Sequence, residues 1–272
     1  MAWRLCCESG LAHRLGKLVY GRERLTKTKE HHKGADYAMS AHMNSRTFVI
    51  VCRGTIGITD NPNDWLNNLG ALLVPLASGK ASNIAKSVFN AVAHRKTPLV
   101  HSGFYDSVKN ISSGVINELI SFRNQVPNGK VFITGHSKGG AMAQIFAELV
   151  AQHGFTKEQI EVITFGAPKV GNKAFGQYIT EKAQIKNIVN KHDSIAGLAV
   201  FNYKPITECV KQIPSALVHK AKEEGFTQWG GLVAAHFMAY TLNYYPSEES
   251  REALRRLNPN AFHAVYEVFL NS

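Results

Sequence analysis

The chain has 272 residues, of which 44% are hydrophobic and 19% are charged, so it can bury a substantial core and is not an intrinsically disordered chain. It carries 31 Lys and Arg against 20 Asp and Glu, and this net charge of +11 favours anionic partners such as a phospholipid surface. The basic residues are spread along the chain instead of forming one long run, so we expect no nucleic-acid-binding arm.

The cysteines and the N-terminus indicate the compartment. The cysteines have neither the pattern of a disulfide framework nor the paired spacing of a metal site, so we expect free thiols and no metal; they are Cys6, Cys7, Cys52 and Cys209. The first residues lack the apolar stretch of a signal peptide, and no window is long enough for a membrane span. We therefore expect a protein that is cytoplasmic or is exported without a cleavable signal.

Strand and helix patterns alternate along the chain. Apolar residues at helical spacing predict helices over 8–20, 81–94, 105–123 and 172–182. Apolar and β-branched runs predict strands over 36–42, 47–52, 131–134, 160–165 and 185–190. The charged segment 22–34 is predicted to be an exposed loop. This alternation predicts one α/β domain over residues 1–272, with a mainly parallel central sheet and helices on both faces.

A Gly-x-Ser-x-Gly motif at Gly135, Ser137 and Gly139 lies between strand 131–134 and a helical pattern that starts at Ala141. The glycines allow the strand and the helix to pack closely around a serine in a strained conformation, which lifts its hydroxyl out of the chain. The N-terminus of the following helix offers N–H groups to a developing oxyanion. This context predicts a nucleophile elbow instead of an ordinary turn rich in glycine.

A serine nucleophile requires a base and an acid, which follow it in the order acid and then histidine in this type of fold. Asp193 is the only aspartate after Ser137 in the sequence, and it follows strand 185–190 closely. We therefore predict that Asp193 is the acid. The alternatives that remain are glutamates that follow no clear strand end, namely Glu208, Glu223 and Glu224.

The histidines that follow Asp193 are His219, His236 and His263. His236 comes directly after 230–235, a run of small residues that can approach the elbow, and we predict that it is the base. His219 lies in a lysine-rich segment and His263 lies near the C-terminus, where solvated or core roles are more common. We interpret His136 and His192, the neighbours of the nucleophile and the acid, as structural.

Two further segments complete the predicted site. Strand 47–52 ends at Arg53-Gly54-Thr55, and a fold with a nucleophile elbow commonly takes the second donor of its oxyanion hole from such a strand end. Segment 56–69 begins polar and then places Trp65, Leu66 and Leu69 on one helical face, which predicts an amphipathic lid. A core strand with an edge loop is the alternative, and for 72–74 we favour the strand.

Several motifs in the chain carry a family resemblance, in the order in which that family has them: 53–55 (RGT), 101–104 (HSGF), 135–141 (GHSKGGA), 164–172 (TFGAPKVGN), 190–193 (NKHD) and 235–240 (AHFMAY). Together they resemble the class 3 lipases, the fungal-lipase-like branch of the α/β hydrolases. The resemblance extends over about residues 11–245. It implies an α/β-hydrolase fold with a short lid, and a serine hydrolase of lipid esters that needs no metal or cofactor.

The resemblance also implies roles for individual residues. Ser137, Asp193 and His236 would form the triad, and the N–H groups of Thr55 and Lys138 would form the oxyanion hole. The lid would lie at 63–69, with the three apolar residues Trp65, Leu66 and Leu69.

The sequence departs from the family in three respects. Lys138 replaces the leucine that usually follows the serine, and Ile195-Ala196 replaces the usual Val-Pro after the acid. The disulfides of the secreted fungal members have no counterpart in this sequence.

These features lead us to expect a triacylglycerol lipase or phospholipase that works through an acyl-enzyme. Its basic surface would make transient contact with anionic membranes. The alternatives are a non-catalytic membrane-binding module and a phospholipase that acts as an exported toxic effector.

Overall fold

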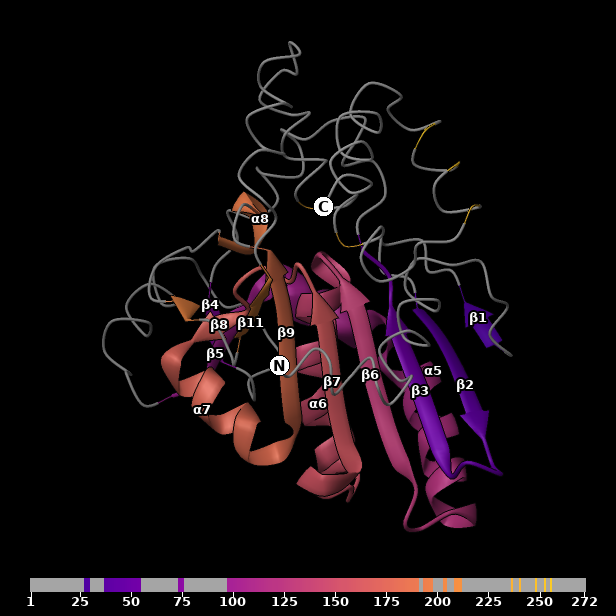
Figure 1. Cartoon of the computed structure of the whole chain (residues 1–272). Coiled ribbons are helices and arrows are strands. Elements are labelled where there is room, and N and C mark those ends of the chain that lie inside the picture. Colours follow the sequence, from indigo (N-terminus) through magenta and orange to yellow (C-terminus); the bar gives the residue numbers. More distant parts are fainter. Residues whose placement is uncertain are drawn as a thin grey trace.

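The computed structural model describes residues 27–29, 37–54, 73–75, 97–190, 193–197, 203–204 and 208–211, and the single positions 236, 240, 248, 252 and 255. The largest unit in this part of the chain is a seven-stranded sheet of order β1-β2-β3-β6-β7-β9-β11 (Figure 1). Its strands are β1 (Lys27–Lys29), β2 (Tyr37–His42), β3 (Thr47–Cys52), β6 (Lys130–His136), β7 (Ile160–Phe165), β9 (Gln184–Asn190) and β11 (Glu208–Lys211).

Strands β1, β2 and β3 pair antiparallel, whereas β3, β6, β7, β9 and β11 pair parallel in that order. The central strands β3, β6 and β7 are mostly buried, and their buried apolar residues include Ile50, Ile133 and Val162, as expected for a sheet covered by helices. The register places Cys52 of β3 opposite Gly135 of β6, so these two strands end at the same edge.

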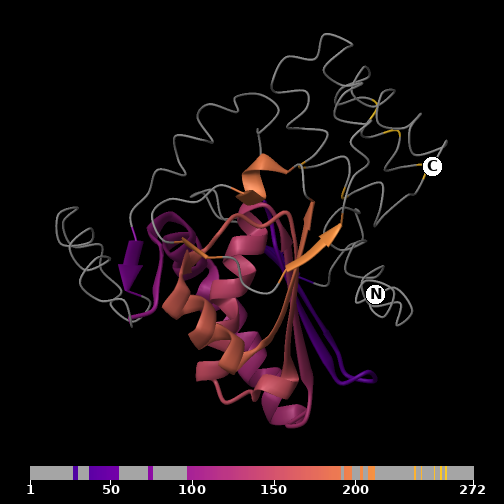
Figure 2. The same ribbon diagram turned by 60° about the vertical axis from the view of Figure 1, so that its left-hand side comes forward.

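The three long helices of the described part lie on the same face of this sheet (Figure 2). They are α5 (Ser102–Gln125), α6 (Lys138–Gln152) and α7 (Lys173–Lys182). Helix α6 is the central one, since it packs against both α5 and α7 and against β3, β6 and β7. Its buried face includes Met142, Ile145 and Phe146, which form the core with the strands beneath them.

A second, smaller sheet and two short helices complete the described part of the chain. A four-stranded sheet has the order β10 (Tyr203–Lys204), β8 (Gly171–Asn172), β5 (Leu99–His101) and β4 (Leu73–Pro75). The side chain of Asn172 ties it to α7, because its Oδ1 accepts the N–H of Phe175 at the helix start and the N–H of Leu99 from β5. The short 3₁₀ helix η1 (Lys157–Gln159) precedes β7, and the short helix α8 (Ser194–Gly197) follows β9.

The strands predicted at 36–42, 47–52, 131–134, 160–165 and 185–190 are confirmed within two residues. The helices predicted at 105–123 and 172–182 are also confirmed, and α5 begins three residues earlier than expected because His101 caps it by accepting the N–H of Gly103. The favoured strand at 72–74 is present as β4, one residue later along the chain.

One prediction is wrong in part. The segment 22–34, expected to be a loop, contains strand β1, which pairs with β2 at the edge of the sheet. An edge strand needs no apolar pattern, and lysines such as those of its Lys-Thr-Lys sequence are common on edge strands. The helices predicted over 8–20 and 81–94 lie outside the described residues. Among the helices that the structure describes, none is long and apolar enough to cross a membrane.

Candidate active site

The turn between β6 and α6 holds Ser137 in an uncommon backbone conformation. Its φ is 55° and its ψ is −128°, a region that costs a residue with a side chain about 1–3 kcal/mol. The surrounding backbone holds it there, because the Ser137 N–H donates to the carbonyl of Phe165 on β7 over 2.9 Å. The carbonyl of Ser137 in turn accepts the N–H of Ala141 over 3.2 Å, in the first turn of α6. The predicted elbow conformation is therefore present.

The glycines of the motif are required because backbone packs against backbone at this turn. A Cβ atom added at Gly139 would lie 2.1 Å from the carbonyl oxygen of Cys52, and one added at Gly135 would lie 2.4 Å from the carbonyl carbon of Gly139. Neither contact involves a side chain that can move aside. The close approach of α6 to β3 and β6 therefore depends on residues without side chains.

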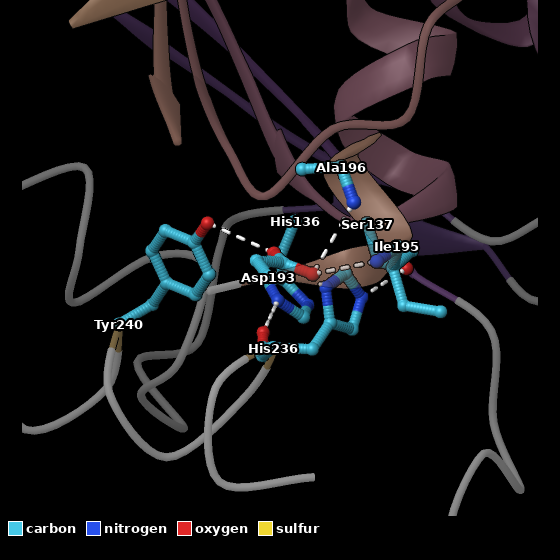
Figure 3. A network of polar contacts seen from close by, with 7 residues as sticks. All are labelled: His136, Ser137, Asp193, Ile195, Ala196, His236 and Tyr240. Carbon is cyan, nitrogen blue, oxygen red and sulfur yellow. Dashed lines mark hydrogen bonds and ion pairs between the residues drawn. The ribbon is translucent and has the colours of Figure 1, made fainter. Parts of the chain in front are cut away.

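Ser137, Asp193 and His236 lie in direct contact although they are far apart in the sequence (Figure 3). The Nε2 of His236 lies 2.8 Å from the Oγ of Ser137, and its Nδ1 lies 2.8 Å from the Oδ2 of Asp193. All three side chains are buried. The elbow delivers the serine, and the carboxyl end of β9 delivers the aspartate. This is the spatial arrangement of a Ser-His-Asp triad.

The two oxygens of Asp193 have different partners. Oδ2 accepts hydrogen bonds from His236 Nδ1 and, over 2.9 Å, from the hydroxyl of Tyr240. Oδ1 accepts the backbone N–H groups of Ile195 at 2.9 Å and Ala196 at 3.2 Å, so that Asp193 caps the short helix α8. With its Nδ1 donating to the aspartate, a neutral His236 presents an unprotonated Nε2 to the serine hydroxyl.

His136, the residue before Ser137, contacts His236, the predicted base, directly. Its Nε2 donates to the backbone carbonyl of His236 over 2.6 Å, and the centroids of the two rings are 4.7 Å apart. Burial lowers the pKa of His136 well below its usual range, and the nearby charge of His236 lowers it further. The hydrogen bond to the His236 carbonyl opposes this shift without reversing it. Our interpretation of this residue as merely structural left out the contact with the base.

The structure describes part of the predicted site. Lys138 is the first residue of α6 and is partly exposed. Thr55 and the lid residues lie outside the described residues, and so do the alternatives His219, His263, Glu223 and Glu224. The remaining alternative acid, Glu208, lies on β11.

Sequence reasoning missed Tyr240 as a partner of Asp193. The contact joins residues 47 positions apart in the sequence, and the residue pattern around Tyr240 gave no signal for it. Within the described ranges, no group of three or more His, Cys, Asp or Glu side chains is placed to hold a metal ion. Cys52 is a buried free thiol, and its burial raises its pKa to about 12.

Comparison with known proteins places the chain among lipases. It is 32% identical over 165 residues to a lipase of Rhizomucor miehei, covering 59% of this chain and 40% of that protein. It is 29% identical over 163 residues to a chloroplastic phospholipase A(1) of Arabidopsis thaliana, covering 57% of this chain and 34% of that protein. The chain thus spans less than half the length of these curated relatives.

Solved structures show the same fold. The Rhizomucor miehei triacylglyceride lipase matches with a TM-score of 0.60 at 22% identity, over 75% of this chain and 80% of that one. A triacylglycerol lipase from Penicillium expansum matches with a TM-score of 0.57 at 18% identity, over 74% and 77% of the two chains. The predicted α/β-hydrolase fold is confirmed. The model of the family Lipase (class 3) matches residues 49–203, which is more than half of the sequence, and the chain therefore belongs to the class 3 lipase family.

Proposed function

We propose that this protein is a serine hydrolase that cleaves the carboxylic ester bonds of lipids through an acyl-enzyme. The observation that carries the proposal is the 2.8 Å contact between Ser137 Oγ and His236 Nε2 at a strained elbow, with Asp193 on the other side of the imidazole. The family membership and the lipase activities named for its relatives support the same chemistry.

In the first half of the reaction, His236 Nε2 takes the proton of the Ser137 hydroxyl while Oγ attacks the carbonyl carbon of the ester. The carbonyl oxygen becomes an oxyanion, and His236 becomes an imidazolium ion. The carboxylate of Asp193, 2.8 Å from Nδ1, stabilises this positive charge and holds the ring in place.

The oxyanion requires N–H donors that are in place before the reaction. The N–H of Lys138 is suited to this task, because it belongs to the first residue of α6, where the helix dipole also favours negative charge. The class 3 pattern assigns the second donor to Thr55. Because a backbone N–H performs this task, the exchange of leucine for lysine at position 138 leaves it unchanged.

To complete the first half of the reaction, the imidazolium ion donates its proton to the departing alcohol oxygen, and the C–O bond breaks to leave an acyl group on Ser137. A water molecule then gives a proton to His236 Nε2 and attacks the acyl carbon. The second tetrahedral intermediate collapses, the proton returns to Ser137 Oγ, and the fatty acid is released.

The net charge of +11 favours phospholipids over neutral glycerides as substrates, because a basic protein is attracted to anionic membrane surfaces. The relatives include both types of enzyme, a phospholipase A(1) and secreted mono- and diacylglycerol lipases. We therefore propose anionic phospholipid vesicles as the preferred substrate. Release of fatty acid from triacylglycerol emulsions, with none from such vesicles, would reverse this preference.

The experiment that tests the proposed chemistry compares Ser137→Ala with Ser107→Ala. Ser107 is also a buried serine, but its hydroxyl donates to the Gly103 carbonyl within α5, so its loss changes no reacting group. Ser137→Ala should lower the hydrolysis of a short-chain ester at least about a thousand-fold and abolish labelling by a fluorophosphonate, whereas Ser107→Ala should keep both. Full esterase activity in Ser137→Ala would rule out the proposed nucleophile. An unlabelled and inactive wild-type protein would instead favour a non-catalytic lipid-binding role.

A further inference from the structure

His236 contacts two consecutive residues of the elbow, once through its side chain and once through its backbone. Its Nε2 lies 2.8 Å from Ser137 Oγ, and its carbonyl oxygen lies 2.6 Å from His136 Nε2 (Figure 3). We propose that His136 is a positioning residue, which sets the distance between the base and the nucleophile by holding the backbone of His236. This inference rests on the proposed hydrolase function and extends it to a residue that touches no substrate.

The chemistry of the contact fixes the state of His136. A backbone carbonyl only accepts hydrogen bonds, so the proton of this bond is on His136 Nε2. The side chain is buried, and its lowered pKa keeps the ring neutral. The centroid of the His136 ring lies 4.7 Å from that of the His236 ring. A neutral His136 does not repel the positive charge that His236 acquires during the reaction, whereas a protonated His136 would.

The covalent structure makes this contact effective. His136 and Ser137 share one peptide unit, and His136 is the last residue of β6, where it is paired with Phe165 on β7. Its side chain therefore links the backbone of His236 to the same rigid strand that delivers the nucleophile. A displacement of about 1 Å in a catalytic group can cost about 100-fold in rate, so this link has kinetic consequences.

The segment that carries the base is held at a second point as well. Tyr240, four residues further along the chain, donates to Asp193 Oδ2, and its ring centroid lies 5.7 Å from that of His136. Asp193 holds the imidazole of His236 but not its backbone carbonyl. Loss of the His136 contact would therefore remove one restraint on the backbone of His236 while its side chain stays bonded to the aspartate.

The test uses the whole chain of 272 residues and compares two variants that differ at position 136. His136→Phe keeps a flat ring but removes the donor, whereas His136→Gln keeps an N–H donor at a similar distance from the backbone. The matched control is His153→Phe near the end of α6. His153 makes the same kind of bond, from ring Nδ1 to the Leu149 carbonyl over 2.7 Å, away from the triad.

The rate of labelling of Ser137 by a fluorophosphonate and the kcat and KM for a soluble short-chain ester are measured for each variant. His136→Phe should lower both kcat and the labelling rate roughly 10- to 100-fold, with KM within about threefold of the wild-type value, because substrate binding is untouched. His136→Gln should recover both rates to within about fivefold of wild type, and His153→Phe should leave them unchanged.

Three results would overturn the proposal: a folded His136→Phe protein that labels at the wild-type rate, a His136→Gln protein as slow as His136→Phe, or an equal loss of rate in the His153→Phe control. If circular dichroism shows that His136→Phe does not fold, His136→Asn replaces it, since its amide is one methylene shorter and does not reach the carbonyl. Equal labelling rates for the Asn and Gln variants would then overturn the proposal. Failure of the hydrolase function itself would appear separately, as a wild-type protein that neither labels nor hydrolyses the ester.

Discussion

Two buried carboxylates on this protein have opposite surroundings. Asp193 lies beyond the end of β9 and is 4% exposed, and Glu148 lies near the C-terminal end of α6 and is 5% exposed. Asp193 uses both of its oxygens and has four donors, two on each oxygen. Because their exposed fractions are almost equal, burial does not distinguish the two carboxylates, and their hydrogen-bond partners do.

Glu148 accepts hydrogen bonds through one of its two carboxylate oxygens. Its Oε1 accepts the hydroxyl of Tyr178 over 2.6 Å and the side-chain amide of Gln152 over 2.9 Å. Its Oε2 is buried and has no hydrogen-bond partner among the residues that the structure describes. No imidazole takes part in these bonds, so this cluster can hold α6 against α7 but lacks the histidine base of a Ser-His-Asp triad.

The contrast indicates how the proposed catalytic carboxylate differs from another buried carboxylate of the same fold. A buried charge is tolerated when hydrogen bonds replace the water that it has lost, and a full set of donors also fixes its orientation. Asp193 has that full set and uses one oxygen to orient a histidine. Substitutions that remove one feature at a time from either carboxylate test this view.

The largest difference is expected between Asp193→Asn and Glu148→Gln, which replace each carboxylate by an amide of similar shape. In Asp193→Asn, His236 loses the acceptor that selects its reactive tautomer, so kcat should fall about 10⁴-fold. Glu148→Gln should leave kcat within about twofold, because its contacts lie at the far end of α6 from the elbow.

Steady-state kinetics with a short-chain ester would measure both effects, and circular dichroism would verify that both proteins fold. A similar loss of kcat in the two variants would mean that the rate depends on buried carboxylates in general. Retention of activity by Asp193→Asn would remove Asp193 from the proposed triad.

The sequence was sufficient to predict those parts of the site that follow from local pattern. Gly135 and Gly139 mark the elbow because the chain must turn tightly there, and this constraint is local. Asp193, which the structure places 2.8 Å from His236, could be predicted as its partner because no other aspartate follows Ser137 in the sequence. The strands were predicted closely because an apolar, β-branched run is typical of a buried parallel strand.

The remaining contacts could not be predicted because they join residues that are distant in sequence. His136 reaches the His236 carbonyl across 100 positions, and Tyr240 reaches Asp193 across 47. Such contacts depend on how the segment that carries the base lies against the elbow, and no local pattern encodes that placement. Strand β1 was missed for a related reason, since its pairing with β2 needs no apolar residues of its own.

A smaller effect is expected where the donors of Asp193 are reduced by one. The class 3 pattern usually has proline at the position of Ala196, whose N–H donates to Asp193 Oδ1 over 3.2 Å. Ala196→Pro removes this donor but leaves that of Ile195, and proline is tolerated in the first turn of a helix. A carboxylate held by one bond fewer orients His236 less well, so kcat should fall roughly 3- to 10-fold.

Ala196→Gly is the matched control, since it keeps the N–H and removes only a methyl group. It should retain the wild-type kcat in the same ester assay. If Ala196→Pro matches or exceeds the wild-type kcat, the additional donor has no role in orienting the acid.

The smallest effect concerns the second carboxylate and appears in stability instead of activity. Burial raises the pKa of Tyr178 from 10.0 to about 12, and the hydrogen bond to Glu148 and the charge of Glu148 add to this shift. A pKa that is higher in the folded than in the unfolded chain stabilises the folded state below pH 10, and this contribution is lost as the pH rises from 10 toward 12. In Tyr178→Phe the contribution is absent at every pH.

Urea midpoints should therefore show the wild type more stable than Tyr178→Phe at about pH 9, with the difference shrinking by about pH 11. A difference that stays constant over this range would show that the hydroxyl proton of Tyr178 does not stabilise Glu148. Equal kcat values for the two proteins at about pH 9 would confirm that this carboxylate supports the fold and not the reaction.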